Sequence, residues 1–150
     1  MALVPPEPRH MQRACLRATL LGLCVCLTQP VLAADWQSVG TDADGNRYSV
    51  DAAGTTRDGD LVRVQVRTEY VEPRDDPASG KSIFVALDSM VVDCAKASFA
   101  IEYREYVAAD GSLIPVFATP RENLDLRAAA EGSMSEAIVR SVCRSAAAKR

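Results

Sequence analysis

Arg63, Gln65 and Arg67 form the most binding-like group of residues in this chain. They alternate along an extended segment, so their side chains would project from one face of a β-strand. Two guanidinium groups at this spacing offer planar donors that recognise carboxylate or sulfate groups on a partner. The same residues also fit a solvated strand face on which the arginines pair with neighbouring acids. The sequence leaves both interpretations open, and the first makes these three residues candidates for partner binding.

Residue types for catalysis or for holding a metal are scarce. The only histidine is His10, close to the N-terminus. Glu102 and Glu105 are three residues apart on a predicted strand and would face opposite sides of it. No glycine-rich phosphate loop and no G-x-S-x-G motif occurs, and the segment 42–53 lacks the central glycine and final glutamate of a calcium loop. We therefore predict a protein that binds rather than catalyses, with no cofactor and no metal site.

The first 34 residues are typical of a secretory signal. Two arginines precede an apolar run at 18–27, which is followed by a proline and by small residues ending at Ala33 and Ala34, where we expect cleavage. The apolar run is about ten residues long, well short of the roughly 20 that a membrane-spanning helix needs. We predict no membrane span after the signal is removed. Residues 1–10 have no role in such a signal, so Met11 is an alternative start.

Export would leave Cys94 and Cys143 as the remaining cysteines. In an oxidising compartment this pair predicts a disulfide, which places the protein in the periplasm, on the outer-membrane surface or outside the cell. Closing a loop of this length would stabilise the fold by roughly 4 kcal/mol. Cys24 and Cys26 raise the alternative of a lipid-modified N-terminal cysteine, but each follows a large residue rather than a small one.

Charge and length narrow the class of protein further. The predicted signal contains three arginines and one glutamate, so its removal changes the net charge from −3 to −5. Nucleic acid is therefore not the expected partner, because polyanion binding depends on an excess of positive charge. Residues 35–150 are enough for a single domain.

Turn signals and alternating runs predict an antiparallel sheet. Asp-Gly dipeptides stand at 44–45, 58–59 and 110–111, and this dipeptide supplies the positive φ angles of tight hairpins. Residues 61–72 alternate most regularly between apolar and polar side chains, which indicates one buried and one wet face. We predict about six strands in meander order, at 36–39, 47–51, 61–72, 82–92, 98–107 and 113–118. The segment 73–80, which holds two prolines, is predicted to be the longest loop between strands.

The segment 82–92 differs from the other strands because it is apolar on both faces. Ile83 and Val85 would lie on one face and Phe84 on the other. A strand of this kind is covered on both sides, so we expect another subunit or a partner on the second face, and a homodimer is one such arrangement. Trp36, the only tryptophan, is predicted to lie in the core.

The C-terminal segment reads as a helix that begins at Ser133. Glu136 follows three residues later and completes a capping box. Ile138, Val142 and Cys143 then share one apolar stripe at helical spacing. The predicted fold is α+β: about six antiparallel strands in a meander, with a C-terminal helix packed on one face and linked to the sheet by the disulfide.

Taken together, the chain after the signal resembles the surface-adhesin protein E family of Gram-negative envelope proteins. The residues that carry the resemblance are mostly turn and core residues: Asp35-Trp36, Val39-Gly40, Asp44-Gly45-Asn46, Tyr48, Asp51, Asp58 to Val64, Tyr70, Asp93-Cys94 and Val142-Cys143. The resemblance implies a six-stranded antiparallel sheet whose C-terminal helix is held by a disulfide. It also implies adhesion to host extracellular-matrix proteins, as in the founding members of the family.

We therefore expect an exported envelope or surface binding module without catalytic activity, whose partner is a protein, with a host-matrix protein as one class. The alternative is a periplasmic domain that holds a small apolar ligand or serves a structural role, with no host contact.

Overall fold

The computed structural model describes residues 34–148. The predicted signal up to Ala33 lies outside the described residues, and so does the alternative start at Met11. Six strands follow one another in the sheet in chain order, each antiparallel to the next: β1 (Trp36–Thr41), β2 (Arg47–Asp51), β4 (Leu61–Asp76), β5 (Lys81–Asp93), β6 (Ser98–Ala108) and β7 (Leu113–Ala118). The predicted meander is confirmed.

Two short strands were not predicted. β3 (Thr56–Asp58) pairs with the start of β4, and β8 (Arg127–Ala128) pairs with the start of β6, which makes eight strands in the described part of the chain. A 3-10 turn, η1 (Arg121–Asn123), lies between β7 and β8. Strands of two or three residues leave too little periodicity to detect in a sequence.

The Asp-Gly dipeptides form hairpin turns, as predicted. Gly45, Gly59 and Gly111 have φ angles of 85°, 62° and 78°, which side chains with a Cβ rarely adopt. They lie between β1 and β2, between β3 and β4, and between β6 and β7. The turns set the strand pairing and therefore decide which side chains share a face.

The helix-covered face of the sheet holds the core. In β4, Val62, Val64 and Val66 are almost fully buried, and the residues opposite them in β5 include Val92 and Met90. Their alternation with Arg63, Gln65 and Arg67 confirms the predicted strand with one apolar face. Burying a side chain of this size contributes about 1.5 to 3 kcal/mol, so this face supplies much of the stability of the fold.

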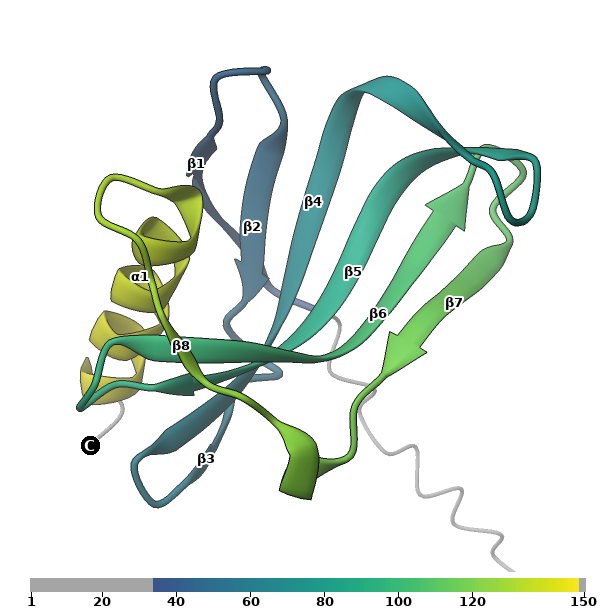
Figure 1. The fold of residues 1–150 in the computed structure, drawn as a ribbon. Coiled ribbons are helices and arrows are strands. Elements are labelled where there is room, and N and C mark those ends of the chain that lie inside the picture. Colours follow the sequence, from purple (N-terminus) through teal and green to yellow (C-terminus); the bar gives the residue numbers. More distant parts are fainter. Residues whose placement is uncertain (1–33, 149–150) are drawn as a thin grey trace, which may run out of the picture. The chain divides into compact units, whose positions relative to one another are not determined.

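The helix α1 (Met134–Ala148) completes that core. Ile138, Val139, Val142 and Ala146 are buried against the sheet, and the helix contacts β1, β4 and β5. Ser133 caps the helix, because its Oγ accepts a hydrogen bond from the Glu136 N–H at 3.2 Å. Figure 1 shows α1 on the β1 side of the sheet, while the turns that join β4 to β5 and β6 to β7 lie far from it. The helix thus covers only part of this face.

The predicted disulfide is present. Cys94, which follows β5, is bonded to Cys143 of α1, with an S–S distance of 2.06 Å and a Cα–Cα distance of 5.5 Å. The bond joins the helix to the sheet at the end of β5. It closes a loop between residues 49 apart in the sequence.

The predicted loop at 73–80 is wrong over its first half. β4 continues to Asp76, and the turn occupies only the residues before Lys81. The pairing of β4 with β5 shifts between Glu69 and Arg74, so several residues of β4 face a single residue of β5. This bulge accommodates Pro73 within the strand, where a proline would otherwise remove a ladder hydrogen bond.

A second register shift, between Ile83 and Val85, corrects the predicted faces of β5. Ile83 is buried and lines a pocket with Tyr70, on the helix side, whereas Phe84 is 41% exposed. Trp36 is half-buried and lies outside the core cluster, and Arg67 on the opposite face lies over its ring. Bulges change which face a residue occupies, so an alternating pattern alone assigned Ile83 and Phe84 wrongly. The prediction that Trp36 lies in the core is also wrong.

Candidate binding sites on the two faces of the sheet

The face of the sheet opposite α1, called the open face below, carries the three residues singled out from the sequence. Arg63, Gln65 and Arg67 project from β4 beside Val91, Ser89 and Leu87 of β5. The structure therefore brings the three predicted residues together on one surface. Whether they bind a partner remains a prediction.

Each of these side chains bonds to a neighbour on the open face. Arg63 donates from Nε and Nη2 to the two carboxylate oxygens of Glu102 in β6, at 2.8 and 3.1 Å. Arg67 pairs with Glu69 at 2.7 Å, and Gln65 donates to the Ser89 hydroxyl at 2.6 Å. Pairing with neighbouring acids, one of the two interpretations left open by the sequence, is thus what the structure shows. A guanidinium that uses two of its five N–H groups still has three to offer a partner.

An apolar pocket of about 130 Å³ lies at one end of the open face. Its lining comes from β3, β4, β5 and the segment after β7, and includes Leu61, Arg63, Val91, Arg121, Leu124 and Leu126. Arg121 lies 3.5 Å from Glu102, so Glu102 pairs with two arginines at the rim of this pocket. A mostly apolar pocket with a few polar groups is the usual form of a small-ligand site.

The opposite face carries a second pocket, called the helix-side pocket below, of about 240 Å³ where the sheet extends beyond α1. Its lining combines apolar side chains of the core with polar residues of β2, β4, β5, β6 and the first turn of α1. The polar members are Tyr48, Thr68, Tyr70, Arg74, Asp88, Arg104 and Ser135. No sequence pattern marked any of these residues as a candidate for ligand binding.

An ion pair lies in the helix-side pocket. Asp88 is 6% exposed and accepts two hydrogen bonds from Arg104, from Nε at 2.6 Å and from Nη2 at 2.7 Å. Hydrogen bonding to Asp88 raises the pKa of Arg104 although burial opposes the charge. The pair therefore holds its two charges together, and the negative charge of Asp88 is balanced within the protein.

The tyrosines at this pocket are held as neutral phenols. Burial, together with a hydrogen bond that the Tyr48 hydroxyl donates to Asp42, raises the pKa of Tyr48 to about 12. Burial also raises the pKa of Tyr70. Both phenols therefore remain protonated near neutral pH, so their hydroxyl groups can donate hydrogen bonds.

Arg74 lines the pocket, and its guanidinium contacts the ring of Tyr70. Its guanidinium lies 4.3 Å from the centre of the Tyr70 ring, and within residues 34–148 it forms no ion pair. The two residues are four apart in β4, a spacing that a regular strand would stretch well beyond contact. The bulge after Glu69 brings them together, which is why no sequence pattern indicated the pair.

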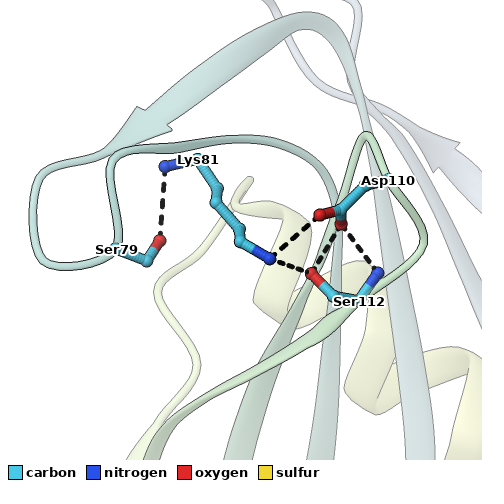
Figure 2. Close-up of polar contacts among 4 residues, drawn as sticks. All are labelled: Ser79, Lys81, Asp110 and Ser112. Carbon is cyan, nitrogen blue, oxygen red and sulfur yellow. Dashed lines mark hydrogen bonds and ion pairs between the residues drawn. The ribbon is translucent and has the colours of Figure 1, made fainter.

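A polar cluster joins the tips of the two long hairpins (Figure 2). The Lys81 ammonium donates to Asp110 Oδ2 at 2.9 Å and to Ser112 Oγ at 2.7 Å, while the Ser112 hydroxyl donates to Asp110 Oδ1 at 2.6 Å. These bonds hold the pKa of Asp110 well below its ordinary value, with the Ser112 hydroxyl as the largest cause. The cluster therefore links the tips of the two hairpins.

Within residues 34–148 no group of three or more His, Cys, Asp or Glu side chains is placed to hold a metal ion. In the same part of the chain no helix has the length and apolar character needed to cross a membrane.

Comparison with known proteins gives one match. A family model described as "Surface-adhesin protein E" matches residues 36–144, from the first residue of β1 to the last turns of α1. Searches of the curated proteins and of the solved structures found no match.

Proposed function

Because this chain belongs to the surface-adhesin protein E family, we propose that it is an exported surface adhesion module that binds a protein partner and performs no catalysis. The observation that supports this proposal most directly is the open face of the sheet. Among the elements that the structure describes, none covers the centre of this face, which presents Arg63, Gln65 and Arg67 in line. A broad face of this kind suits a protein surface better than a small molecule.

The ion pairs on the open face prepare it for binding. Arg63 is held by two bonds to Glu102 and Arg67 by Glu69, so less side-chain entropy is lost when a partner binds. Opposite Arg67 and Glu69, the β5 residues Leu87 and Val85 are half-buried rather than fully covered. Apolar area next to arginine is typical of protein interfaces, in which arginine is enriched.

We propose extracellular-matrix proteins of a host as the class of partner. The test compares immobilised matrix proteins for binding to the wild-type protein and to the double variant Arg63→Ala/Arg67→Ala. We expect the variant to bind at least ten-fold more weakly, since arginines at the centre of an interface often contribute more than 1.4 kcal/mol each. The matched control is Arg140→Ala/Arg144→Ala, which removes the same charge from the outer side of α1. Equal binding by both double variants would contradict a role for the open face.

A second copy of the chain is the other occupant to test on the open face. Light scattering at increasing protein concentration measures the average mass. A strict monomer would argue against self-association, and a dimer broken by Arg63→Ala/Arg67→Ala would place the dimer interface there.

The apolar pocket favours a second candidate function, a periplasmic domain that holds a small apolar ligand. A volume of about 130 Å³ is close to that of cavities that accept a single benzene ring. Location separates the two functions. Protease applied to intact cells should remove an exposed surface module, whereas full protection would favour the periplasmic alternative.

The proposal also includes removal of the signal after Ala33 or Ala34. Asp35 is the residue that leads into β1, and its N–H donates to Asp51 at 2.9 Å, so the sheet begins directly after the proposed cut. Mass spectrometry of the exported protein gives the N-terminus. A mass that includes residues 11–33 would show that the segment is kept.

A further inference from the structure

The helix-side pocket lies on the face opposite the one proposed to bind the partner. Several hydrogen-bond donors that line it have no acceptor within the described chain. Arg74 lies over the pocket with no ion pair in the described chain, held by the ring of Tyr70. Arg104 uses two of its five N–H groups in hydrogen bonds to Asp88, which leaves three to bond to a ligand. The negative charge of Asp88 is therefore balanced by Arg104, whereas the positive charge of Arg74 is not balanced by an ion pair in the described chain.

Thr68 adds a hydroxyl to this wall. The residue is 6% exposed and lines the pocket, and its hydroxyl has no hydrogen-bond partner among residues 34–148. Every buried side-chain oxygen and nitrogen in that part of the chain has a partner, so the Thr68 hydroxyl is itself accessible to solvent and can bond to water or to a ligand. The hydroxyl groups of Tyr70 and Ser135 at the same pocket also have no partner within that part of the chain. Each of these hydroxyl groups can therefore donate to an acceptor on a ligand in the pocket.

The first turn of α1 contributes a further positive wall. Met134 and Ser135 line the pocket, and the first amide groups of a helix carry partial positive charge. Glu136, the acid in this turn, is already bonded to the Gly132 N–H and to Arg140, and this bonding holds its pKa below the ordinary value. The two acids that follow Arg74 in the chain are bonded elsewhere: Asp75 accepts from Ser82, and Asp76 accepts from Ser79. Glu72 and Asp44 line a neighbouring pocket together with Arg74 and form no ion pair with it in the described chain.

The pocket lining is mainly polar, but it also includes apolar side chains. Val66, Met90, Ile101 and Ile138 are among them. Its volume of about 240 Å³ is smaller than the roughly 300 to 1,000 Å³ of pockets for drug-sized molecules. A ligand that fits both parts is small and has an apolar chain or ring attached to an anionic head.

We propose that the helix-side pocket binds a small organic carboxylate, whose head group is held by Arg74, Thr68 and the first turn of α1 and whose apolar body contacts Met90 and Ile138. The source of the carboxylate is a free acid rather than a side chain of a protein, because the pocket is small and lies beside the helix on the face that the proposed partner does not use.

The test is a titration followed by NMR amide shifts, with sodium hexanoate as the probe, hexan-1-ol as its neutral counterpart and inorganic phosphate as an anion without an apolar body. We expect hexanoate to give saturable shifts at Thr68, Arg74 and Ser135 and to bind at least ten-fold more tightly than the other two probes, since hydrogen bonds to a charged group are about twice as strong as neutral ones. A blocked peptide with one glutamate side chain tests the protein source and should bind more weakly than hexanoate.

Two variants test the named contacts. Arg74→Gln removes the unpaired cation from an exposed position and should weaken hexanoate binding by roughly ten-fold or more. Thr68→Val removes the hydroxyl at nearly constant volume and should weaken it by several-fold. The control is Arg144→Gln on the outer side of α1, which should bind as the wild type does. The proposal is overturned if hexanoate gives no saturable shift, if Arg74→Gln binds as tightly as the control, or if hexanol or the peptide binds as well as hexanoate. If Thr68→Val does not fold, the comparison of Arg74→Gln with the control decides the outcome alone.

Discussion

Arg104 and Asp88 face each other across β6 and β5 and share two hydrogen bonds, of 2.6 and 2.7 Å. The pair stands at the point where the apolar core under α1 gives way to the helix-side pocket. Asp88 is the β5 residue opposite Val66, in the same row as the β5 residues opposite Val62 and Val64. Those two residues are apolar, so a charged side chain lies in an otherwise apolar row. The two hydrogen bonds from Arg104 offset the free-energy cost of burying the Asp88 carboxylate.

Removal of either partner of this pair should destabilise the protein. Arg104→Gln leaves the buried Asp88 carboxylate without its ion pair, and we expect a loss of about 2 to 4 kcal/mol in the free energy of unfolding, measured by urea denaturation. The lower part of the range allows for the partial exposure of Arg104. The double variant Arg104→Gln/Asp88→Asn should recover part of the loss. If the double variant is as unstable as the sum of the two single variants, the residues do not act as a pair.

The disulfide should carry a large share of the stability. Replacement of Cys94 and Cys143 by serine removes the closed loop, and the loop-entropy estimate gives a loss of roughly 4 kcal/mol. Thermal unfolding under oxidising conditions measures the effect, and reductant should lower the melting temperature of the wild type towards that of the variant. An unchanged melting temperature of the variant would mean that the bond contributes nothing to the stability of the fold.

The cap of α1 gives a smaller and well-defined effect. Ser133→Ala removes the hydroxyl that accepts the Glu136 N–H, and we expect a loss of about 1 kcal/mol in the free energy of unfolding. Ser141→Ala, within the helix, is the matched control and should be neutral or slightly stabilising, because alanine has the higher helix propensity. Equal effects at the two positions would show that the cap is not formed in solution.

Acid should destabilise the protein through carboxylates whose pKa is lowered on folding. Asp42 accepts hydrogen bonds from Asn46, Tyr48 and the Asp44 N–H, and these hold its pKa below the ordinary value of 3.8. The pKa of Asp110 is lowered by Ser112 and Lys81. A lowered pKa means that the stabilisation is complete above the pKa of the unfolded chain and is lost as the pH falls through the folded value.

The corresponding measurement is the urea midpoint at pH 5 and at successively lower pH below 3.8. We expect the midpoint of the wild type to fall over this range. Asp42→Asn and Asp110→Asn should each have a lower midpoint at pH 5 and a shallower fall. Asp125→Asn is the control, because Asp125 is an exposed residue whose acceptor contact is with Arg127. A fall in Asp42→Asn as steep as in the wild type would exclude Asp42 as a source of the acid effect.

Much of the fold could be predicted because its signals are local. The alternation in 61–72, the Asp-Gly turns and the apolar stripe of α1 each depend on residues close together in the sequence, and antiparallel hairpins join neighbouring strands. The same local signals also predicted that Arg63, Gln65 and Arg67 share a face. Their partners could not be predicted, because Glu102 lies 39 residues from Arg63 and meets it only through the pairing of three strands.

The order and types of the residues were enough to predict the strand order, the helix and its cap, the cysteine pair and the grouping of the three residues of the open face. The strand registers, and with them the helix-side pocket, depend on how the strands pair in three dimensions. Two bulges, one after Glu69 and one at Phe84, place Arg74 on Tyr70 and move Ile83 to the other face. A bulge adds a residue to one strand against its partner, so its position depends on both strands at once, and no pattern within either one reveals it.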